Sequence, residues 1–476
     1  MTISDPIIQT FDNHLDELFM DPYLEPNYRL IEDLEDKLRY EKQITQDPSL
    51  LQKLAPAILR IINSDQTTSE TKRYATRILD IVLPYYTFSQ IAEIFNEDLM
   101  LRAFQGKDYL KCVLAKVIQK AEPSKIVYGP LFLQLFKTFA EPNLDIATVD
   151  AVQKAIVALT LKSDEIRQKF LNDPQIAEIL NQMKDDTVIR AREMDLICEV
   201  LHVIPTFSDS FYLVSEEDIA KSGDILFYQF CLTTWVKLLC LVYEYDNVGF
   251  LTEKLKPQFD FCCRVFTHRE TLLANEEFLD FEELGTTELM ISYSYIAPSV
   301  FKELEEKYHM VDHAIKTYQK DPKSLTFISK VNTLFLRDKY ELYAKFSMSH
   351  PFIELFCSLV EDTYIFRDRL IPTYFPNKGF QNLVFEDIFR LFKTLSLTPE
   401  RIEKMVTIWP LIIEKVINSD INNSILVDTY DLELHLRSLL SCGVPLGNLE
   451  DSVREKLDVL KGKVLPSVEE PLTELH

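Results

Sequence analysis

The chain has 476 residues, 47% hydrophobic and 26% charged, a balance typical of folded proteins rather than disordered ones. Its formal net charge of −24 disfavours binding to nucleic-acid phosphates and anionic lipid heads, because such binding requires clustered Lys and Arg. Only 9 glycines are present, which disfavours β-rich and dinucleotide-binding folds, since their tight turns and phosphate loops depend on glycine.

In chain order, the first strong pattern is a series of apolar stripes at helical spacing. Four such stripes begin near Thr71, Lys107, Asp145 and Thr187. The interval of about 40 residues leaves room for a second helix in each repeat, and two-helix units of this length are typical of HEAT and armadillo repeats. No comparable stretch alternates as a half-buried strand does. The sequence therefore predicts an all-α protein, a curved HEAT/armadillo-like α-solenoid of stacked helix pairs.

The predicted solenoid spans residues 1–476 as a single array. Its N-terminal half, residues 1–205, is the more regular, and the C-terminal half, residues 206–476, is less evenly spaced. Asp173-Pro174 and Asp321-Pro322 each pair a capping carboxylate with a proline at the first helical position, which predicts a helix start at both places. The alternative arrangement is a pair of irregular helical bundles.

The N-terminal segment, the most apolar stretch and the cysteines indicate in which cellular compartment the protein is expected. The N-terminal segment is acidic and has no basic region ahead of an apolar one, so we expect no secretory signal. Gln229 and Lys237 interrupt the most apolar stretch, Phe227–Tyr243, which favours a buried helix over a membrane span. The eight cysteines form no C-x-x-C pair, which favours reduced core thiols. We expect a cytoplasmic protein that could also enter the nucleus.

No motif in the sequence indicates catalysis or a cofactor. His309 and His313 have the spacing of zinc ligands on a helix, but Met310 stands where a zinc protease has its glutamate, and no third ligand is evident. Cys262 and Cys263 lack metal-ligand spacing. Neither a P-loop nor a G-x-G-x-x-G sequence is present. We therefore expect no enzyme activity, no catalytic residue, no cofactor and no metal.

A transport adaptor is one alternative for a solenoid. Armadillo carriers of nuclear cargo line their groove with ladders of Trp and Asn. Here Trp235 and Trp409 are followed four residues later by Leu239 and Ile413 rather than by asparagines. The ladder chemistry is missing, so the sequence disfavours this alternative.

Several segments resemble a known family in their order and spacing. They are YATRILDIVLPYYTFSQIAEIFNEDLMLRAF (74–104), DYLKCVLAKVIQKAEP (108–123), AVQKAIVALTLKSDEIRQKFLNDPQIAEIL (151–180) and ILVDTYDLELHLRSLLSCGV (425–444). The family is that of yeast chaperones for assembly of the base of the proteasome regulatory particle. Its members have also been catalogued as DNA mismatch repair (high-spontaneous-mutagenesis) proteins, and their mammalian counterpart is proteasome non-ATPase regulatory subunit five. The resemblance covers most of the chain.

The resemblance implies a function and partners. Members are curved clamps that bind the C-terminal subdomain of the first proteasome base ATPase. They hold it in a precursor with a second base ATPase and a large non-ATPase subunit, and they leave before the proteasome is complete. An assembly chaperone of this kind needs neither direct nucleic-acid contact nor a membrane. The alternatives are a DNA mismatch repair accessory protein or another protein-binding scaffold.

Polar positions on helices that could line the inner face of the solenoid are the candidate partner contacts. An acidic surface fits a polar grip on a basic partner, although each position has an ordinary solvated helix residue as its alternative. The candidates are Asp150, Arg190, Glu193, Asp195, Asp428 and Asp431.

Overall fold

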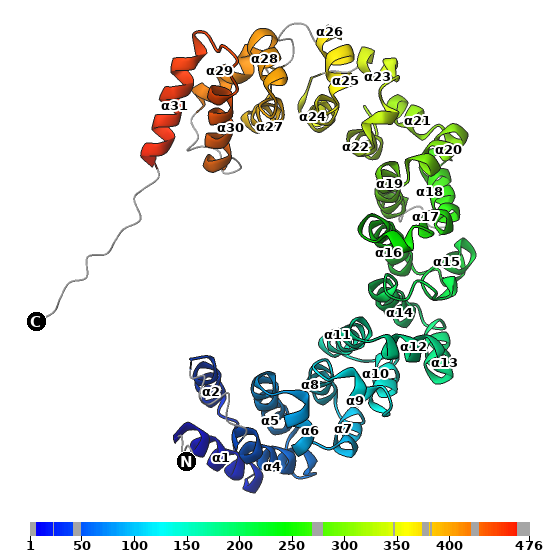
Figure 1. Ribbon diagram of the computed structural model, residues 1–476, viewed down its shortest axis with the longest axis vertical. Helices are drawn as coiled ribbons and strands as arrows, with labels where there is room; N and C mark the ends of the chain where they lie inside the picture. The colour runs from blue at the N-terminus through cyan, green and yellow to red at the C-terminus, as the bar shows by residue number, and fades with distance from the viewer. Residues whose placement is uncertain are drawn as a thin grey trace, which may run out of the picture. The chain divides into compact units, whose positions relative to one another are not determined.

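The computed structural model describes residues 6–21, 23–40, 49–268, 279–345, 348–373, 380, 383–419 and 428–463. Every regular element within these ranges is a helix, which confirms the predicted all-α solenoid class. The helices form two compact units, unit 1 (Met1–Leu251) and unit 2 (Thr252–His476), and each is described by itself. Figure 1 shows the helices in chain order.

The first layer of unit 1 is a row of helices in which each packs on the next, and Figure 1 shows them side by side. Their starts are spaced by about 40 residues, which confirms the predicted repeat length. Polar contacts, which we call the polar ladder, connect neighbouring helices of the row. The helices are α5 (Ser69–Val82), α8 (Asp108–Ile118), α11 (Ile146–Lys162), α14 (Thr187–Val200) and α16 (Ile225–Glu244).

Three contacts illustrate the ladder. Lys116 Nζ lies 2.7 Å from Asp80 Oδ1, joining α8 to α5. The Thr148 hydroxyl donates to the Asp108 carbonyl oxygen at 3.0 Å, joining α11 to α8. Thr187 Oγ1 donates to Asp224 Oδ2 at 2.9 Å, joining α14 to the start of α16. Each bond holds two helices of successive repeats in register, as expected where repeats contact only their neighbours.

Shorter helices complete unit 1. In the second layer, α10 packs against both α7 and α13, and α12 packs against α13. The N-terminal helices pack on the first repeat through the contacts of α2 and α4 with α5. The helices are α1 (Pro6–Met20), α2 (Tyr28–Tyr40), α4 (Ser49–Asn63), α6 (Phe88–Ile94), α7 (Glu97–Phe104), α9 (Pro123–Ile126), α10 (Leu131–Phe139), α12 (Asp164–Asn172), α13 (Pro174–Met183) and α15 (Glu216–Ser222), with 3-10 turns at Leu83–Tyr85, Asp209–Phe211 and Asp246–Val248.

Unit 2 repeats the scheme with less even spacing. Its row is α19, α22, α24, α27 and α30, in which each helix packs on the next. The helices are α17 (Leu251–Lys254), which begins at the unit boundary, α18 (Lys256–His268), α19 (Leu279–Ile296), α20 (Pro298–Tyr308), α21 (Met310–Thr317), α22 (Pro322–Lys330), α23 (Tyr340–Lys345), α24 (Ile353–Glu361), α25 (Thr363–Ile365), α26 (Ile371–Thr373), α27 (Phe385–Leu395), α28 (Pro399–Ile408), α29 (Pro410–Asn418), α30 (Thr429–Ser441) and α31 (Leu449–Lys463), with 3-10 turns at Thr333–Phe335 and His350–Phe352 and a π-helical turn at Phe366–Leu370.

Capping and aromatic packing explain why these segments fold as they do. Asp173 accepts a hydrogen bond from the Gln175 N–H at 2.9 Å, and Asp321 accepts one from the Ser324 N–H at 3.0 Å, which confirms both predicted helix starts. The core of unit 1 contains four phenylalanine rings that meet edge to face, with ring centroids between 4.7 and 6.5 Å apart. The rings belong to Phe132, Phe136, Phe170 and Phe207.

One helix of the described part of the chain, α16, is long and apolar enough by length and composition to cross a membrane. In unit 1 it packs against α14 and α15, and its Tyr228, Leu232 and Trp235 side chains are fully buried. Packing in unit 1 therefore accounts for one face of this helix, whereas Leu226 and Tyr243 are exposed, so the burial predicted for Phe227–Tyr243 holds for only part of the stretch.

Candidate partner-binding site

Two of the predicted contact residues lie on neighbouring first-layer helices of unit 1. Asp150 on α11 is exposed and forms an ion pair with Lys154 one turn away, at 2.8 Å. Asp195 on α14 is half-buried between a 2.7 Å ion pair with Lys237 of α16 and a 2.8 Å hydrogen bond from the Gln153 side-chain amide. Asp195 thereby joins three successive first-layer helices.

Glu199, which the sequence analysis missed, connects these two aspartates. Burial raises the pKa of the Glu199 carboxyl, and the negative charges of Asp195 and Asp150 raise it further, while Lys237 lowers it. The negative charges of Asp150 and Asp195 therefore act on the Glu199 carboxyl across α11 and α14. We call Asp150, Asp195 and Glu199 the acidic cluster. The available signal was the spacing: Glu199 follows Asp195 by one helical turn.

Arg190 lies in a different contact on α14. Its guanidinium is 3.7 Å from the Asp218 carboxylate of α15 and lies over the Phe227 ring at 5.9 Å. The side chain is largely buried, with 15% of its surface exposed. Arg190 thus contributes to the packing of α14 against α15 and α16, and only its edge is available to a partner.

The expectation for Glu193 needs correction. Glu193 on α14 is fully buried, so its carboxylate is not available to a partner's surface. Neither carboxylate oxygen has a hydrogen-bond partner in the described part of the chain, and burial raises the pKa to about 8, partly offset by Lys184 and Arg190. Helical periodicity places Glu193 two residues before Asp195, on a different side of α14, and that side faces the core.

Two further candidates belong to unit 2. Asp428 is exposed and caps α30, where it accepts a hydrogen bond from the Tyr430 N–H at 2.9 Å. Asp431, one turn into α30, forms an ion pair with Lys393 of α27. That pair lowers the pKa of Asp431, the bond from Lys393 being the main cause. Both side chains remain partly open to solvent, Asp428 as a cap and Asp431 as a link between successive helices.

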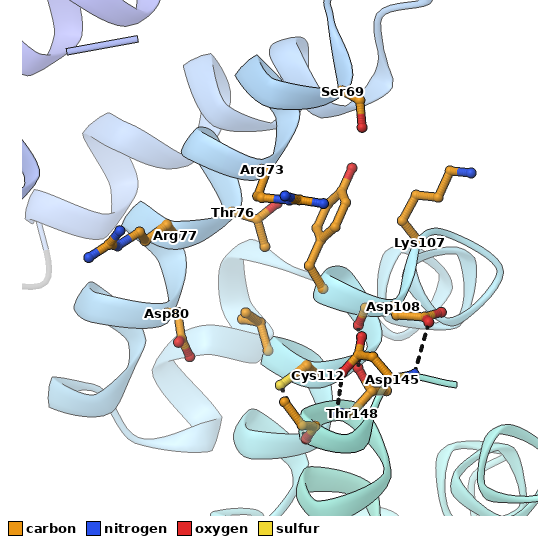
Figure 2. A pocket seen from close by; sticks show the side chains of 13 residues that line it. Ser69, Arg73, Thr76, Arg77, Asp80, Lys107, Asp108, Cys112, Asp145 and Thr148 are labelled. Carbon is orange, nitrogen blue, oxygen red and sulfur yellow. Dashed lines mark hydrogen bonds between the residues drawn. The ribbon is translucent and has the colours of Figure 1, made fainter. Parts of the chain in front are cut away.

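A cavity of unit 1 lies among α5, α8 and α11 and has a volume of about 710 Å³. Figure 2 shows Arg73 of α5 and Lys107, at the start of α8, extending on two sides of it, with Asp108, Asp145 and Thr148 on the wall between α8 and α11. Most side chains that line it are polar or charged, so the cavity is suited to a charged ligand rather than to a lipid or an apolar cofactor.

The residues considered for metal or redox chemistry have structural surroundings. Among the described residues, no group of three or more His, Cys, Asp or Glu is placed to hold a metal ion. His309 is exposed at a left-handed position with φ of 52°, and His313 packs its ring edge against Phe266. All eight cysteines are free thiols, and burial raises the pKa of Cys198 to about 12.

The two tryptophans have core positions, which bears on the transport alternative. Trp235 of α16 and Trp409, which caps α29, are both fully buried. Trp409 lies within 6.2 Å of the rings of Phe356, Phe366 and Phe380. Neither indole is on a surface, so neither can form the exposed ladder that a nuclear cargo carrier needs.

Known proteins match the chain over most of its length. A family model described as "DNA mismatch repair protein HSM3, N terminal domain" matches residues 12–240, and its C-terminal counterpart matches residues 249–464. A DNA mismatch repair protein HSM3 of Kluyveromyces lactis is 21% identical over 366 residues, which are 74% of this chain and 75% of that protein. The protein of the same name from Candida albicans is 24% identical over 237 residues, 46% of this chain and 49% of that protein.

Proposed function

The chain belongs to the family of the DNA mismatch repair protein HSM3, and from this premise we propose that it is an assembly chaperone of the proteasome regulatory-particle base. Support comes from the family that segments 74–180 and 425–444 resemble. It also comes from the acidic cluster, which lies on the neighbouring first-layer helices α11 and α14 of unit 1. In this proposal the partner is the C-terminal subdomain of the first base ATPase, within a precursor that includes a second base ATPase and a large non-ATPase subunit.

The proposed mechanism is steric and reversible. The chain would cover a folded surface of the ATPase, hold it in the precursor and delay its docking on the core particle until release. The electrostatic part of the proposal depends on the acidic cluster, in which Asp150 and Glu199 are exposed, Asp150 within a solvent-open pair with Lys154, and Asp195 is half-buried against Lys237. Two exposed carboxylates on adjacent helices fit a basic patch, and such contacts act mainly on the association rate.

The partner is tested by capture from cells. A tagged full-length chain should recover base ATPase subunits without core-particle subunits in matching amounts. Binding should persist when the ATPase is reduced to its C-terminal subdomain, because a solenoid grips a folded surface rather than a short peptide. Quantitative capture that contains no base ATPase would refute the assembly-chaperone proposal and leave a helical protein-binding scaffold of other function.

Charge reversal at the acidic cluster tests the proposed grip. Asp150→Lys with Glu199→Lys should weaken binding of the ATPase subdomain about fivefold or more, mostly through slower association, with a smaller effect at high salt. The measurement is surface plasmon resonance at two salt concentrations. Both side chains are exposed, so circular dichroism of the double variant should match the parent.

A matched control carries the same change in net charge outside the first layer. Glu165→Lys with Asp185→Lys alters two exposed acidic residues, one on α12 and one in the turn after α13. This control should bind with less than about a twofold change. An equal loss in both double variants would show that net charge, rather than the acidic cluster, governs association.

The name of the family provides a second candidate, a direct role in DNA mismatch repair. The net charge of −24 opposes it, because duplex DNA requires neutralising cations. We predict no appreciable affinity for duplex DNA at physiological salt in a gel-shift titration of the full chain. Submicromolar, salt-sensitive binding would reverse the ranking of the two candidates, and a tagged chain should then recover mismatch-recognition proteins.

A further inference from the structure

Three cationic side chains at the rim of the α5/α8/α11 cavity have no acidic partner among the residues that the structure describes. They are Arg73 and Arg77 of α5 and Lys107 at the start of α8, and all three are exposed. None of them forms an ion pair or a hydrogen bond within the described part of the chain. The whole sequence holds 75 acidic and 51 basic residues, so most cations could find a carboxylate partner. Three cations without an acidic partner in the described residues around one cavity are therefore unexpected.

The carboxylates that share the cavity are already engaged. Asp80 pairs with Lys116, and its two oxygens lie 2.7 and 2.9 Å from Nζ. Asp108 Oδ2 accepts a hydrogen bond from the Asp145 N–H at 3.2 Å, and Asp145 caps α11 through the Thr148 N–H at 2.8 Å. These contacts engage the carboxylates with groups other than the three rim cations. Figure 2 shows Asp108, Asp145 and Thr148 together, apart from Arg73.

The rim cations are therefore available to an anion from outside. Arg73 and Arg77 are one turn apart on α5, where like charges repel in the absence of an anion. An arginine presents a planar fork that binds a carboxylate through two hydrogen bonds, and two forks with one ammonium can hold more than one carboxylate. Lys107 precedes α8 and gives that helix no side-chain cap, so the positive end of the helix adds to the field.

Exposed apolar residues continue from the cavity along the edge of the first layer. Ile146, at the first position of α11 beside the cavity-lining Ala147, has 88% of its surface exposed. Val188 in the first turn of α14 and Leu226 in the first turn of α16 are also exposed. Because α11, α14 and α16 pack in sequence, the row extends the charged cavity with apolar contact surface.

We propose that the α5/α8/α11 cavity binds an acidic, amphipathic segment of a partner protein. Its carboxylates pair with Arg73, Arg77 and Lys107, and its apolar side chains cover the exposed row that begins at Ile146. A nucleic acid fits less well, because a polyphosphate would gain nothing from the apolar row. The site has the opposite sign to the acidic cluster, and it does not depend on which protein that cluster binds.

The test uses the full chain and a short fluorescein-labelled peptide of alternating Glu-Glu and Leu-Leu pairs, followed by fluorescence anisotropy. The probe should bind, and the same peptide with glutamine in place of glutamate should bind at least about tenfold more weakly. Arg73→Ala with Arg77→Ala should weaken binding of the acidic probe about tenfold, and Lys107→Ala by about threefold. Inorganic phosphate should compete only weakly.

Two controls keep the result interpretable. Lys53→Ala with Lys137→Ala removes two exposed positive charges from α4 and α10, outside the cavity, and should change probe binding by less than about twofold. Arg73→Glu with Arg77→Glu should lose the acidic probe and gain a lysine–leucine peptide of the same pattern. That gain would show that the altered chain is folded and that the cavity selects by charge.

Three results would overturn the proposal. They are equal binding of the glutamate and glutamine peptides, an unchanged affinity after Arg73→Ala with Arg77→Ala, and tighter binding of an oligonucleotide than of the acidic probe at the same salt. None of these measurements involves a proteasome subunit. The peptide measurements therefore test the cavity proposal alone, and capture of base ATPase subunits tests the assembly-chaperone proposal alone.

Discussion

Replacing Glu193 by glutamine is expected to stabilise unit 1 at neutral to alkaline pH and to change its stability little near about pH 5. The reason is the fully buried carboxyl, whose pKa is raised to about 8 by burial, against an ordinary value of 4.5. Between these two values the folded chain binds one proton more than the unfolded chain does. Stability therefore falls as pH rises through this window and stays low above it, because the carboxyl is then ionised in both the folded and the unfolded chain.

The size of the effect follows from the width of the window. The free energy of unfolding should differ between the Glu193→Gln chain and the parent by less than about 1 kcal/mol at about pH 5 and by about 4 kcal/mol at about pH 8. For a unit of this size, about 4 kcal/mol corresponds to an increase of about 8 °C or more in Tm. Circular dichroism melts of both chains over this pH range measure the difference directly.

Glu165→Gln is the matched control, because Glu165 is an exposed glutamate of the same unit. Its Tm should follow that of the parent at every pH to within about 1 °C, as surface substitutions rarely matter. If the Glu193→Gln chain and the parent lose Tm in parallel as pH rises, Glu193 is not the group that carries a proton into the fold.

The repeat pattern of the N-terminal half was predictable because it depends on local chemistry. Apolar spacing marks each first-layer helix, and Asp145 caps α11 in the sequence position where the third stripe was expected to begin. Neighbouring repeats bury those stripes against each other, so period and packing agree. The division at Leu251 was not foreseen, because a unit boundary depends on how many contacts cross it rather than on any residue at that point.

The burial of individual candidate contact residues could not be predicted from the local sequence. Asp150 and Asp195 are on the polar sides of their helices, but Glu193 is fully buried, against the general rule that glutamates are exposed. Only the packing of α14 against its neighbours reveals this. The rim of the α5/α8/α11 cavity was also missed, because Arg73, Arg77 and Lys107 come from two helices that a sequence does not place together.

Truncating Phe170 to alanine is expected to destabilise unit 1 by about 3–5 kcal/mol, the usual cost of removing a buried aromatic ring. Phe170 on α12 is 1% exposed. Its ring centroid lies 4.7 Å from that of Phe136 on α10 and 5.0 Å from that of Phe207, in the segment after α14. Removing the ring therefore leaves a cavity among three successive parts of the second layer, and each neighbour loses an edge-to-face contact.

The loss should stay local, because helices of a solenoid contact mainly their neighbours in sequence. Hydrogen exchange of the Phe170→Ala chain should show faster exchange in α10, α12 and α13, while α27 and α29 of unit 2 keep the protection they have in the parent. Phe170→Leu keeps most of the volume and should cost about 1–1.5 kcal/mol. A uniform rise in exchange across both units would contradict this expectation, since it would mean that the two units unfold as one cooperative body.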